Sequence, residues 1–412
     1  MYARLLSVLV ATVLCSAANA QSRAEVEAQF RTWLETDVRP AAEAAGVSRS
    51  IFDGAFESVT LDWDLPGLMP PGSDPDAPRR QRQAEFGAPA AYFAPGIVEA
   101  AASEGRRMAT RHAALLAETE RSSGVPGHIV LGIWGRESAY GRAAIAHDVF
   151  RVLATRGFMG LRRDYFAGEL VAALQIAEAR HIPEALMKSS QAGALGQPQF
   201  MPSNFLAYAT DGDGDGRADI WRSDADTIAS IATYLDRHGW VAGRDWGFEV
   251  IVPPDVSCAL EGPDQGRAIS DWEAMGIRRT GGRDFPAHER AAEGYLMMPA
   301  GRLGPAFVVT PNFYVLKEYN TSDLYALFVG HVGDRIAFGS KAFAAQWQPI
   351  DDLYRSDIAR LQRGLEALGH DVGGADGLPG FRTRRSIGRW QAANGRAETC
   401  FPDRASIAAL VP

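Results

Sequence analysis

The stretch His128-Ile-Val-Leu-Gly-Ile-Trp-Gly-Arg-Glu-Ser-Ala-Tyr-Gly141 has the pattern of a buried helix that carries one acid. Three apolar residues precede Glu137 by seven, four and three positions, and at 3.6 residues per turn they share its face: Val130, Ile133 and Trp134. A carboxylate on the apolar face of a core helix must be protonated, paired or functional, because burying an isolated charge is costly.

The position of Glu137 allows a catalytic interpretation and a structural one. Burial raises the pKa of a carboxyl group, and a raised pKa produces a general acid near neutral pH. Tyr140 and Gly141 are expected to continue the same helical face and to form an aromatic wall beside a gap. The alternative is a structural carboxylate that forms an ion pair with Arg136 or Arg142.

Two segments further along the chain favour catalysis. The first is Ser190-Gln-Ala-Gly-Ala-Leu-Gly-Gln-Pro-Gln-Phe-Met-Pro-Ser-Asn-Phe205, and the second is Asp211-Gly-Asp-Gly-Asp-Gly216. Glu137-Ser-Ala-Tyr-Gly141, followed by the Gly-rich Gln-Phe-Met-Pro segment, resembles the membrane-bound lytic transglycosylase B family of peptidoglycan-cleaving enzymes. The resemblance covers roughly residues 25 to 345 and implies a mainly helical, lysozyme-like catalytic domain.

The resemblance implies a reaction that needs a single acid and no catalytic cofactor. Most glycosidases use two carboxylates, whereas the matched motifs contain only Glu137. In this family the acid is understood to protonate the bond between N-acetylmuramic acid and N-acetylglucosamine, while the acetamido group of the sugar shields the cationic centre. The same carboxylate then takes the proton of the 6-hydroxyl, and a 1,6-anhydro ring forms without water.

Further site residues are implied by matching motifs. The glycan strand is expected to contact Ser190, Gln199, Tyr319, Asn320, Tyr325, Arg162 and Arg163. The amide of Gln199 can both donate to and accept from sugar hydroxyls and acetamides. Arg162 and Arg163 are expected to bind carboxylates of the strand. The alternative is that both arginines lie on a solvated helix face. A buried core tyrosine is the corresponding alternative for Tyr325.

The Asp-Gly segment has the ligand spacing of a calcium-binding EF-hand loop. Asp211, Asp213 and Asp215 supply hard oxygens, the carbonyl of Arg217 a fourth, and Gly216 stands at the sharp turn. Position twelve of the loop is Arg222 instead of glutamate. The resemblance implies a longer loop, closed by Asp226 or, less favoured, Asp224, that holds a structural calcium ion. A sodium ion or a metal-free acidic turn are the alternatives.

The N-terminus has the features of an export signal. Arg4 is followed by the apolar run from Leu5 to Leu14, which is too short for a stable membrane anchor, and Ala18-Asn-Ala20 fits a cleavage site. Leu14 before Cys15 argues against lipid attachment, so we expect a periplasmic protein that is associated with the cell wall. Membrane anchoring is the alternative.

Charge and cysteine content narrow the range of partners. The net charge of −8 gives no basic footprint for nucleic acid or an anionic membrane. The resemblance implies the peptidoglycan strand as the partner, and it leaves other cell-wall enzymes open as further partners. After signal cleavage Cys258 and Cys400 remain. Export makes a disulfide chemically feasible, but the sequence does not decide whether the two cysteines pair.

The chain is expected to contain a catalytic domain over residues 21–345 and a separate module over residues 354–412. Within the first, a lysozyme-like core spans about 96–240 and a small β-insertion about 245–311, because short apolar runs with turn residues follow Gly239. One long helix is predicted from Pro95 to Arg121, and helix is expected to resume at Ser322 after the insertion.

The last 60 residues have a compact helical pattern of their own. Ile358, Leu361, Leu365 and Leu368 form one stripe, and Thr383 opens a second helix. Their order resembles the three-helix peptidoglycan-binding module of many wall enzymes. A helical cap without a ligand is the alternative.

Two other functions compete with the lytic transglycosylase. A muramidase would use the same Glu137 but add water, and the nature of the new chain ends separates the two reactions. A non-catalytic scaffold that binds the wall is the third hypothesis, which the intact Glu137, Ser190 and Gln199 argue against.

Overall fold

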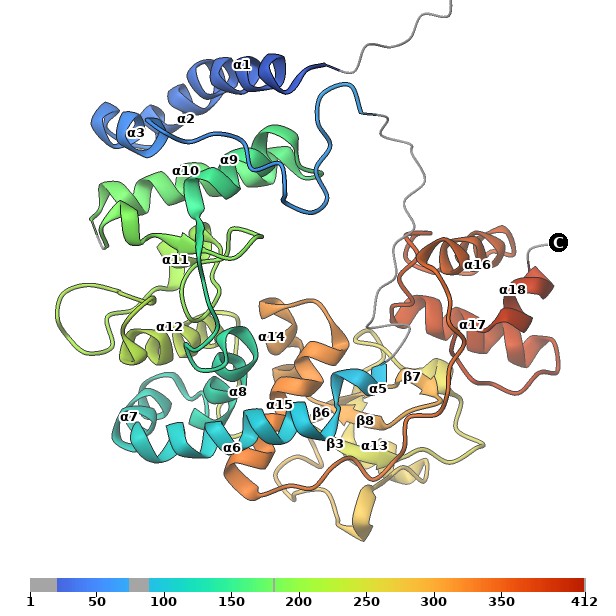
Figure 1. The fold of residues 1–412 in the computed structure, drawn as a ribbon. Coiled ribbons are helices and arrows are strands. Elements are labelled where there is room, and N and C mark those ends of the chain that lie inside the picture. Colours follow the sequence, from blue (N-terminus) through green and yellow to red (C-terminus); the bar gives the residue numbers. More distant parts are fainter. Residues whose placement is uncertain (1–20, 74–88, 181, 411–412) are drawn as a thin grey trace, which may run out of the picture. The chain divides into compact units, whose positions relative to one another are not determined.

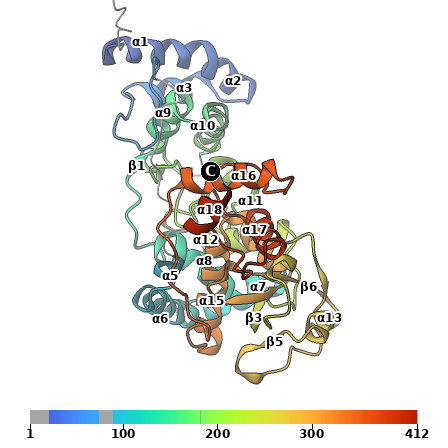
Figure 2. The same ribbon diagram turned by 90° about the vertical axis from the view of Figure 1, so that its right-hand side faces the viewer.

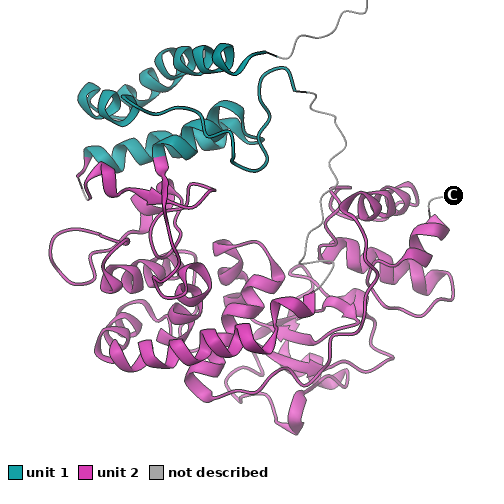
Figure 3. Cartoon of the chain, in the orientation of Figure 1, with its two compact units in different colours: residues 1–77, 150–178 teal, residues 78–149, 179–412 magenta. Residues whose placement is uncertain are grey.

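The computed structural model describes residues 21–73, 89–180 and 182–410. The chain divides into two compact units, one made of residues 1–77 and 150–178 and the other of residues 78–149 and 179–412 (Figure 3). The predicted signal peptide, residues 1–20, lies outside the described residues. In the described ranges, no helix combines the length and the apolar character that crossing a membrane requires.

All regular secondary structure in the described residues of the first unit is helical (Figure 1). Its elements are α1 (Arg23–Trp33), the π-helical turn η1 (Leu34–Val38), α2 (Arg39–Ala44), α3 (Arg49–Phe56), α9 (Val149–Met159) and α10 (Arg163–Glu178). Helix α10 packs on α2 and α3. Leu170 and Leu174 of α10 are fully buried, whereas Tyr165 in the first turn of the helix is 37% exposed.

The second unit is built around the helix that carries Glu137. Its helical elements are α5 (Pro89–Tyr92), α6 (Pro95–Arg111), α7 (Ala113–Ser123), α8 (Gly127–Ser138), α11 (Pro202–Tyr208), α12 (Asp224–Arg237), α14 (Pro311–Tyr319) and α15 (Asp323–Phe338). Helix α8 packs against α6, α12 and α15. The single long helix predicted from Pro95 to Arg121 is wrong, because the backbone leaves the helical region at His112 and separates α6 from α7.

Helix α8 ends earlier than the sequence pattern indicates. Ala139, Tyr140 and Gly141 all have positive φ angles, of 50°, 59° and 77°, so Tyr140 and Gly141 do not continue the helical face. Tyr140 instead packs edge-on against Trp134 and donates a hydrogen bond to the carbonyl of Ala101. The turn therefore ends α8 one residue after Glu137.

A small antiparallel sheet follows α12, where the sequence predicts a β-insertion. Its strand order is β4 (Arg267–Ala268), β6 (Glu293–Met297), β8 (Ala306–Val309), β3 (Gly247–Ile251) and β5 (Arg278–Arg279). The three central strands correspond to the three predicted apolar runs. Short elements complete the unit: β1 (His147–Asp148), η2 (Glu184–Leu186), β2 (Lys188–Ser189), η3 (Cys258–Leu260), α13 (Ile269–Ala274), η4 (Thr280–Gly282) and β7 (Pro299–Arg302).

Two consecutive helices lead from the sheet back to the helical core. Helix α14 is absent from the sequence prediction, although Thr310 accepts a hydrogen bond from the backbone of Asn312 as its N-cap and Pro311 occupies the first helical position. Helix α15 begins after Ser322, which caps it as predicted by accepting from the Tyr325 amide. This cap fixes the start of the helix that faces Glu137.

The C-terminal module contains α16 (Arg355–Ala367), α17 (Phe381–Ala393) and α18 (Arg404–Leu410), which gather in one group (Figures 1 and 2). Leu361, Leu365 and Ile387 form its buried core, and the prediction of a mainly helical fold with a three-helix module is confirmed. Leu368 is 60% exposed because it lies just beyond the end of α16, so it does not belong to the predicted stripe.

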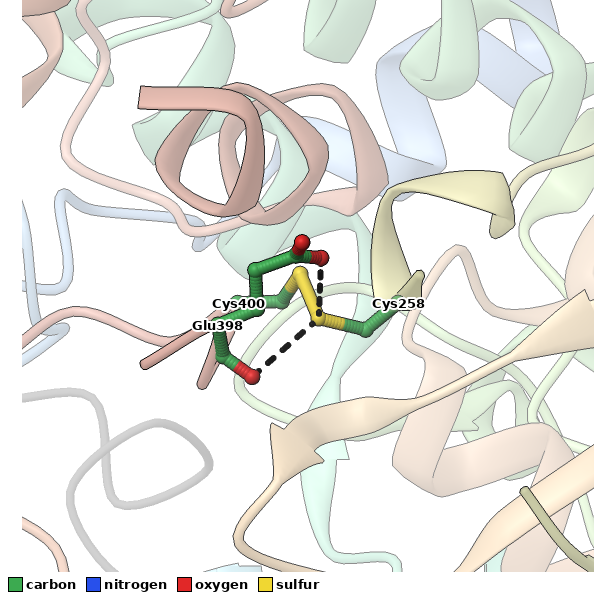
Figure 4. A group of neighbouring side chains, drawn as sticks. All are labelled: Cys258, Glu398 and Cys400. Carbon is green, nitrogen blue, oxygen red and sulfur yellow. Dashed lines mark hydrogen bonds between the residues drawn. A yellow bond between two sulfur atoms is a disulfide. The ribbon is translucent and has the colours of Figure 1, made fainter. Parts of the chain in front are cut away.

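A disulfide ties the module to the rest of the unit. Cys258 in η3 is bonded to Cys400, which follows α17 (Figure 4). Both cysteines are fully buried, and the carboxylate and carbonyl of Glu398 lie beside the Cys258 sulfur (Figure 4). The pairing that the sequence left open is thus made, and it links the insertion to the module.

Candidate active site

Glu137 lies in the last turn of α8 and faces α15. The hydroxyl of Tyr325 donates a hydrogen bond to Oε1 of Glu137. Burial raises the pKa of Glu137 to about 7, although the hydrogen bond from Tyr325 and the charge of Arg136 both act in the opposite direction. A carboxyl group with a pKa near neutrality can donate a proton as a general acid and later accept one as a base.

The two arginines that could have made Glu137 a structural ion pair are engaged elsewhere. Arg142 pairs with Glu104 at 2.9 Å. The Arg136 guanidinium donates to the hydroxyl of Tyr92 at 2.7 Å and lies over its ring. The position of both arginines favours the catalytic interpretation of Glu137.

A second tyrosine connects Tyr325 to the glycine-rich segment. The rings of Tyr319 and Tyr325 are stacked, with 6.4 Å between their centroids. The hydroxyl of Tyr319 donates to the carbonyl of Pro198 at 2.7 Å. Burial, together with the nearby charge of Glu137, raises the pKa of both tyrosines well above the usual value. Both hydroxyls therefore remain protonated hydrogen-bond donors at neutral pH.

The glycine-rich segment forms a tight, internally bonded loop. The hydroxyl of Ser190 accepts hydrogen bonds from the amides of Ala192 and Ala194. Gln199 has a φ of 55°, in the left-handed region, and its side-chain amide donates to the carbonyl of Gly196. Left-handed backbone at a non-glycine residue is strained and is found disproportionately at functional sites. The loop adjoins the Tyr319 hydroxyl, so Gln199 and Tyr325 belong to one connected region.

Gln197 is a site residue that the sequence analysis missed. It is 5% exposed, and its side-chain oxygen accepts from the indole nitrogen of Trp134 at 2.8 Å. A Cβ on Gly141 would lie 2.4 Å from the same oxygen. Gln197 thus holds the Gly-rich loop against the helix of Glu137. The sequence carried no signal for this, because a lone glutamine in a loop does not identify its partner.

The remaining predicted contacts are distributed over both units. The side-chain oxygen of Asn320 accepts from the amide of Ser322, at the start of α15. Arg162 and Arg163 belong to the first unit, where Arg162 lies over the ring of Tyr165 and Arg163 donates to the carbonyl of Met69. The roles of Asn320, Arg162 and Arg163 toward a substrate stay predictions.

The Asp-Gly loop brings three of the predicted metal ligands together. One carboxylate oxygen from each of Asp211, Asp213 and Asp226 lies within 4.8 Å of the others. Gly216 has a φ of 88°, as the predicted sharp turn requires. Asp215 turns its carboxylate to the amide of Arg217 instead. The donor set of three hard oxygens therefore fits a calcium ion.

Asp226 is the buried member of this group. It is 1% exposed, and it accepts hydrogen bonds from the amides of Gly212 and Asp219. Burial raises the pKa of Asp226, and the charge of Asp213 adds to the effect. A bound cation would compensate the cost of keeping these carboxylates ionised side by side.

Family models match most of the chain. The model of the transglycosylase SLT domain matches residues 29–334, and that of a putative peptidoglycan binding domain matches residues 354–410. Membrane-bound lytic murein transglycosylase B of Escherichia coli (strain K12) is 34% identical over 215 residues, which are 52% of this chain and 58% of that protein. The aligned part therefore spans little more than half of this curated relative.

Solved structures extend the similarity over nearly the whole chain. SltB3 from Pseudomonas aeruginosa, in complex with NAG-anhNAM-pentapeptide, is 35% identical with a TM-score of 0.82, and the match covers 93% of this chain and 99% of that one. The Escherichia coli lytic transglycosylase SLT35, in complex with calcium, is 25% identical with a TM-score of 0.57, and the match covers 76% of this chain and 93% of that one.

Proposed function

This chain belongs to the transglycosylase SLT domain family, and on that premise we propose that it is a lytic transglycosylase of peptidoglycan. Its reaction is the cleavage of the bond between N-acetylmuramic acid and N-acetylglucosamine, with formation of 1,6-anhydro-N-acetylmuramic acid ends. The observation that carries the proposal is Glu137, which has a tyrosine as its hydrogen-bond partner and a pKa raised to about 7 by burial.

One carboxyl group suffices for the proposed reaction. Among the described residues, the side chain that hydrogen-bonds to Glu137 is a tyrosine and not a second carboxylic acid. Protonated Glu137 donates its proton to the glycosidic oxygen, and the acetamido oxygen of the substrate shields the developing cation. The carboxylate then accepts the proton of the 6-hydroxyl, which closes the anhydro ring. Product analysis separates this reaction from muramidase hydrolysis, because only hydrolysis adds water to the new chain end.

Replacing Tyr325 by Phe is expected to change the pH dependence of the reaction. The hydrogen bond from Tyr325 lowers the pKa of Glu137, so its loss raises that pKa further. The general acid then keeps its proton to higher pH, and the alkaline limb of kcat shifts upward. We also expect kcat to fall about 10-fold, because the acid is less well oriented.

The pH profile is measured as the initial rate of anhydro-end formation between pH 5 and 9. Tyr295→Phe is the matched control, since it removes a hydroxyl that donates to Glu293 on strand β6 and should leave the limb in place. An unchanged or acid-shifted limb in Tyr325→Phe contradicts the assignment of Tyr325 as the partner of the acid.

We further propose that Asp211, Asp213 and Asp226 bind a structural calcium ion, with Asp215 and the carbonyl of Arg217 completing the loop. The proximity of three carboxylates, one of them buried, supports this, as does the calcium complex of SLT35. The ion supplies no catalytic chemistry. It would hold the loop that precedes α12, a helix that packs against α8.

Asp226→Asn is expected to abolish stabilisation by calcium. Adding calcium to the metal-free native protein should raise its thermal unfolding midpoint by several degrees, since a ligand that binds only the folded state stabilises it. The variant should show no such rise. Asp236→Asn, which changes an exposed aspartate of the same helix, should respond as the native protein does. If calcium raised the unfolding midpoint equally in both variants, Asp226 would not be a calcium ligand.

We propose that the protein acts in the periplasm, where it is associated with the cell wall. The match to a peptidoglycan-binding module supports association with the wall. Export depends on the leader predicted in residues 1–20, which lies outside the described residues. Identification of the first residue of the mature protein by mass spectrometry tests cleavage after Ala20.

A further inference from the structure

A cavity of about 550 Å³ lies within the second unit, between the C-terminal module and the segment that carries Tyr325. Residues 320–324 line one side, and the N-terminal end of α17 lines the other. We propose that this cavity binds the peptide stem of peptidoglycan, a short peptide with carboxylate and ammonium groups. The inference rests on the proposed function and adds a second site for the same substrate.

The charges around the cavity suit a peptide with both signs of charge. Lys317, Arg382 and Arg384 contribute three cations, and Asp323 and Asp376 two carboxylates. Asp323 is neutralised, because Lys317 and Arg384 both pair with it. Arg382 is half exposed, and its ion pair with Asp371 is long, at 3.6 Å. This leaves one accessible guanidinium for a peptide carboxylate and Asp376 for an ammonium group.

One helix N-terminus reinforces the cationic side of the cavity. Helix α15 begins at Asp323 and helix α17 at Phe381, and both starts line the cavity, but the start of α15 is already capped by Ser322. Helix α17 runs over 13 residues, and in the described structure no side chain caps its start at Gly380. The partial positive charge at such an end favours an anion. Together with Arg382, it provides a place for a carboxylate on the module.

The neutral part of the lining favours a peptide over a sugar. Asn320, Thr321 and Ser322 offer amide and hydroxyl groups that can bond peptide units. Leu324 and Leu378 supply apolar contacts for small alkyl side chains. Phe381 is the one aromatic residue in the lining, whereas a sugar ring characteristically packs on broad aromatic faces. The volume is also that of a site for a small organic molecule.

A short series of hydrogen bonds links the lining of the cavity to Glu137. Asn320 accepts from the Ser322 amide, and Ser322 accepts from the amide of Tyr325, whose hydroxyl holds Glu137. A peptide that contacts residues 320–324 therefore orders the same turn that positions Tyr325. We expect strands with peptide stems to be cleaved more efficiently than strands without them.

Arg382→Glu tests the site in the full-length oxidised protein that also carries Glu137→Gln, so that nothing is turned over. The probe is the free tetrapeptide L-Ala-γ-D-Glu-meso-diaminopimelyl-D-Ala, titrated by calorimetry. Arg382→Glu should raise its Kd at least about 10-fold, since reversing the charge places two anions together. Arg389→Glu is the matched control, because Arg389 is exposed on the same helix two turns further on, and it should leave the Kd unchanged. Absence of saturable binding, or equal Kd values for the two variants, overturns the proposal.

A second measurement separates this site from the reaction itself. We compare kcat/KM on strands with stems and on strands stripped of them by an amidase. In proteins with intact Glu137, Arg382→Glu should lower the ratio of the two values at least about 3-fold relative to Arg389→Glu. An unchanged ratio overturns the site while leaving the transglycosylase function standing. If the native protein forms no anhydro ends on either substrate, the proposed function fails, and the peptide titration still decides the cavity.

Discussion

Glu137→Gln is expected to lower the rate of strand cleavage by at least about 1,000-fold, within the range of about 100- to 10,000-fold that a general acid contributes. The amide has the shape of the carboxyl group and can accept the hydrogen bond from Tyr325. It has no proton to donate at neutral pH, so the glycosidic oxygen must leave as an alkoxide. Binding of the strand should persist, because the contacts of the loop and the module are unchanged.

The measurement is the initial rate of new chain ends on purified peptidoglycan, with strand binding measured in parallel. Glu118→Gln is the matched control, since Glu118 is a glutamate on α7 whose side chain is 67% exposed. It should retain full activity. If Glu137→Gln kept a tenth of the native rate or more, another group would have to be the acid.

Arg384→Met is expected to destabilise the protein by about 3–5 kcal/mol, the cost of leaving a buried charge without its partner. Arg384 is 1% exposed on α17 and forms two hydrogen bonds with the carboxylate of Glu261. It also pairs with Asp323 at the start of α15. Glu261 is fully buried, so without the guanidinium its ionised form is no longer compensated. Arg384 joins the module to Glu261 and to the start of α15. Its replacement should therefore weaken the packing of the module against the rest of the unit.

Urea unfolding of the oxidised protein measures this change. The double variant Arg384→Met with Glu261→Gln should recover part of the lost free energy, since it removes the uncompensated charge as well. Arg389→Met removes an exposed arginine from the same helix and should change the stability by less than about 0.5 kcal/mol. A similarly small effect of Arg384→Met would show that the buried pair does not hold the module.

Local patterns were sufficient for the parts of the site that lie on one element. The apolar face of α8 identified Glu137, because helical spacing reports burial directly. The Asp-Gly spacing predicted that Asp211 and Asp213 lie side by side, as they do, because neighbouring residues of a loop follow its turn. The N-cap at Ser322 was also predicted correctly, since capping depends on neighbouring residues only.

Contacts between distant segments could not be obtained in this way. The hydrogen bond between Trp134 and Gln197 and the ion pair of Arg384 with Glu261 are two examples. Neither contact produces a pattern of spacing that could be recognised in the sequence. The disulfide of Cys258 and Cys400 joins residues 142 positions apart, so its formation depends on how the module docks.

Errors in the predicted elements came from local backbone geometry. The turn after Ser138 has three residues with positive φ, of which only Gly141 is a glycine. A pattern of apolar residues at helical spacing therefore continued past the true end of the helix. The break at His112 and the short helix α14 were missed for the same reason, because helix termini depend on caps and packing that periodicity does not contain.

The most direct test of the account is digestion of purified peptidoglycan by the native protein in water enriched in heavy oxygen, followed by mass spectrometry of the released muropeptides. The account predicts products that are one water lighter than hydrolysis products, that carry no heavy oxygen at the muramic acid end, and that are absent with Glu137→Gln. Products that carry one heavy oxygen at each new end would show that water is the acceptor, and they would contradict the transglycosylase assignment in favour of a muramidase.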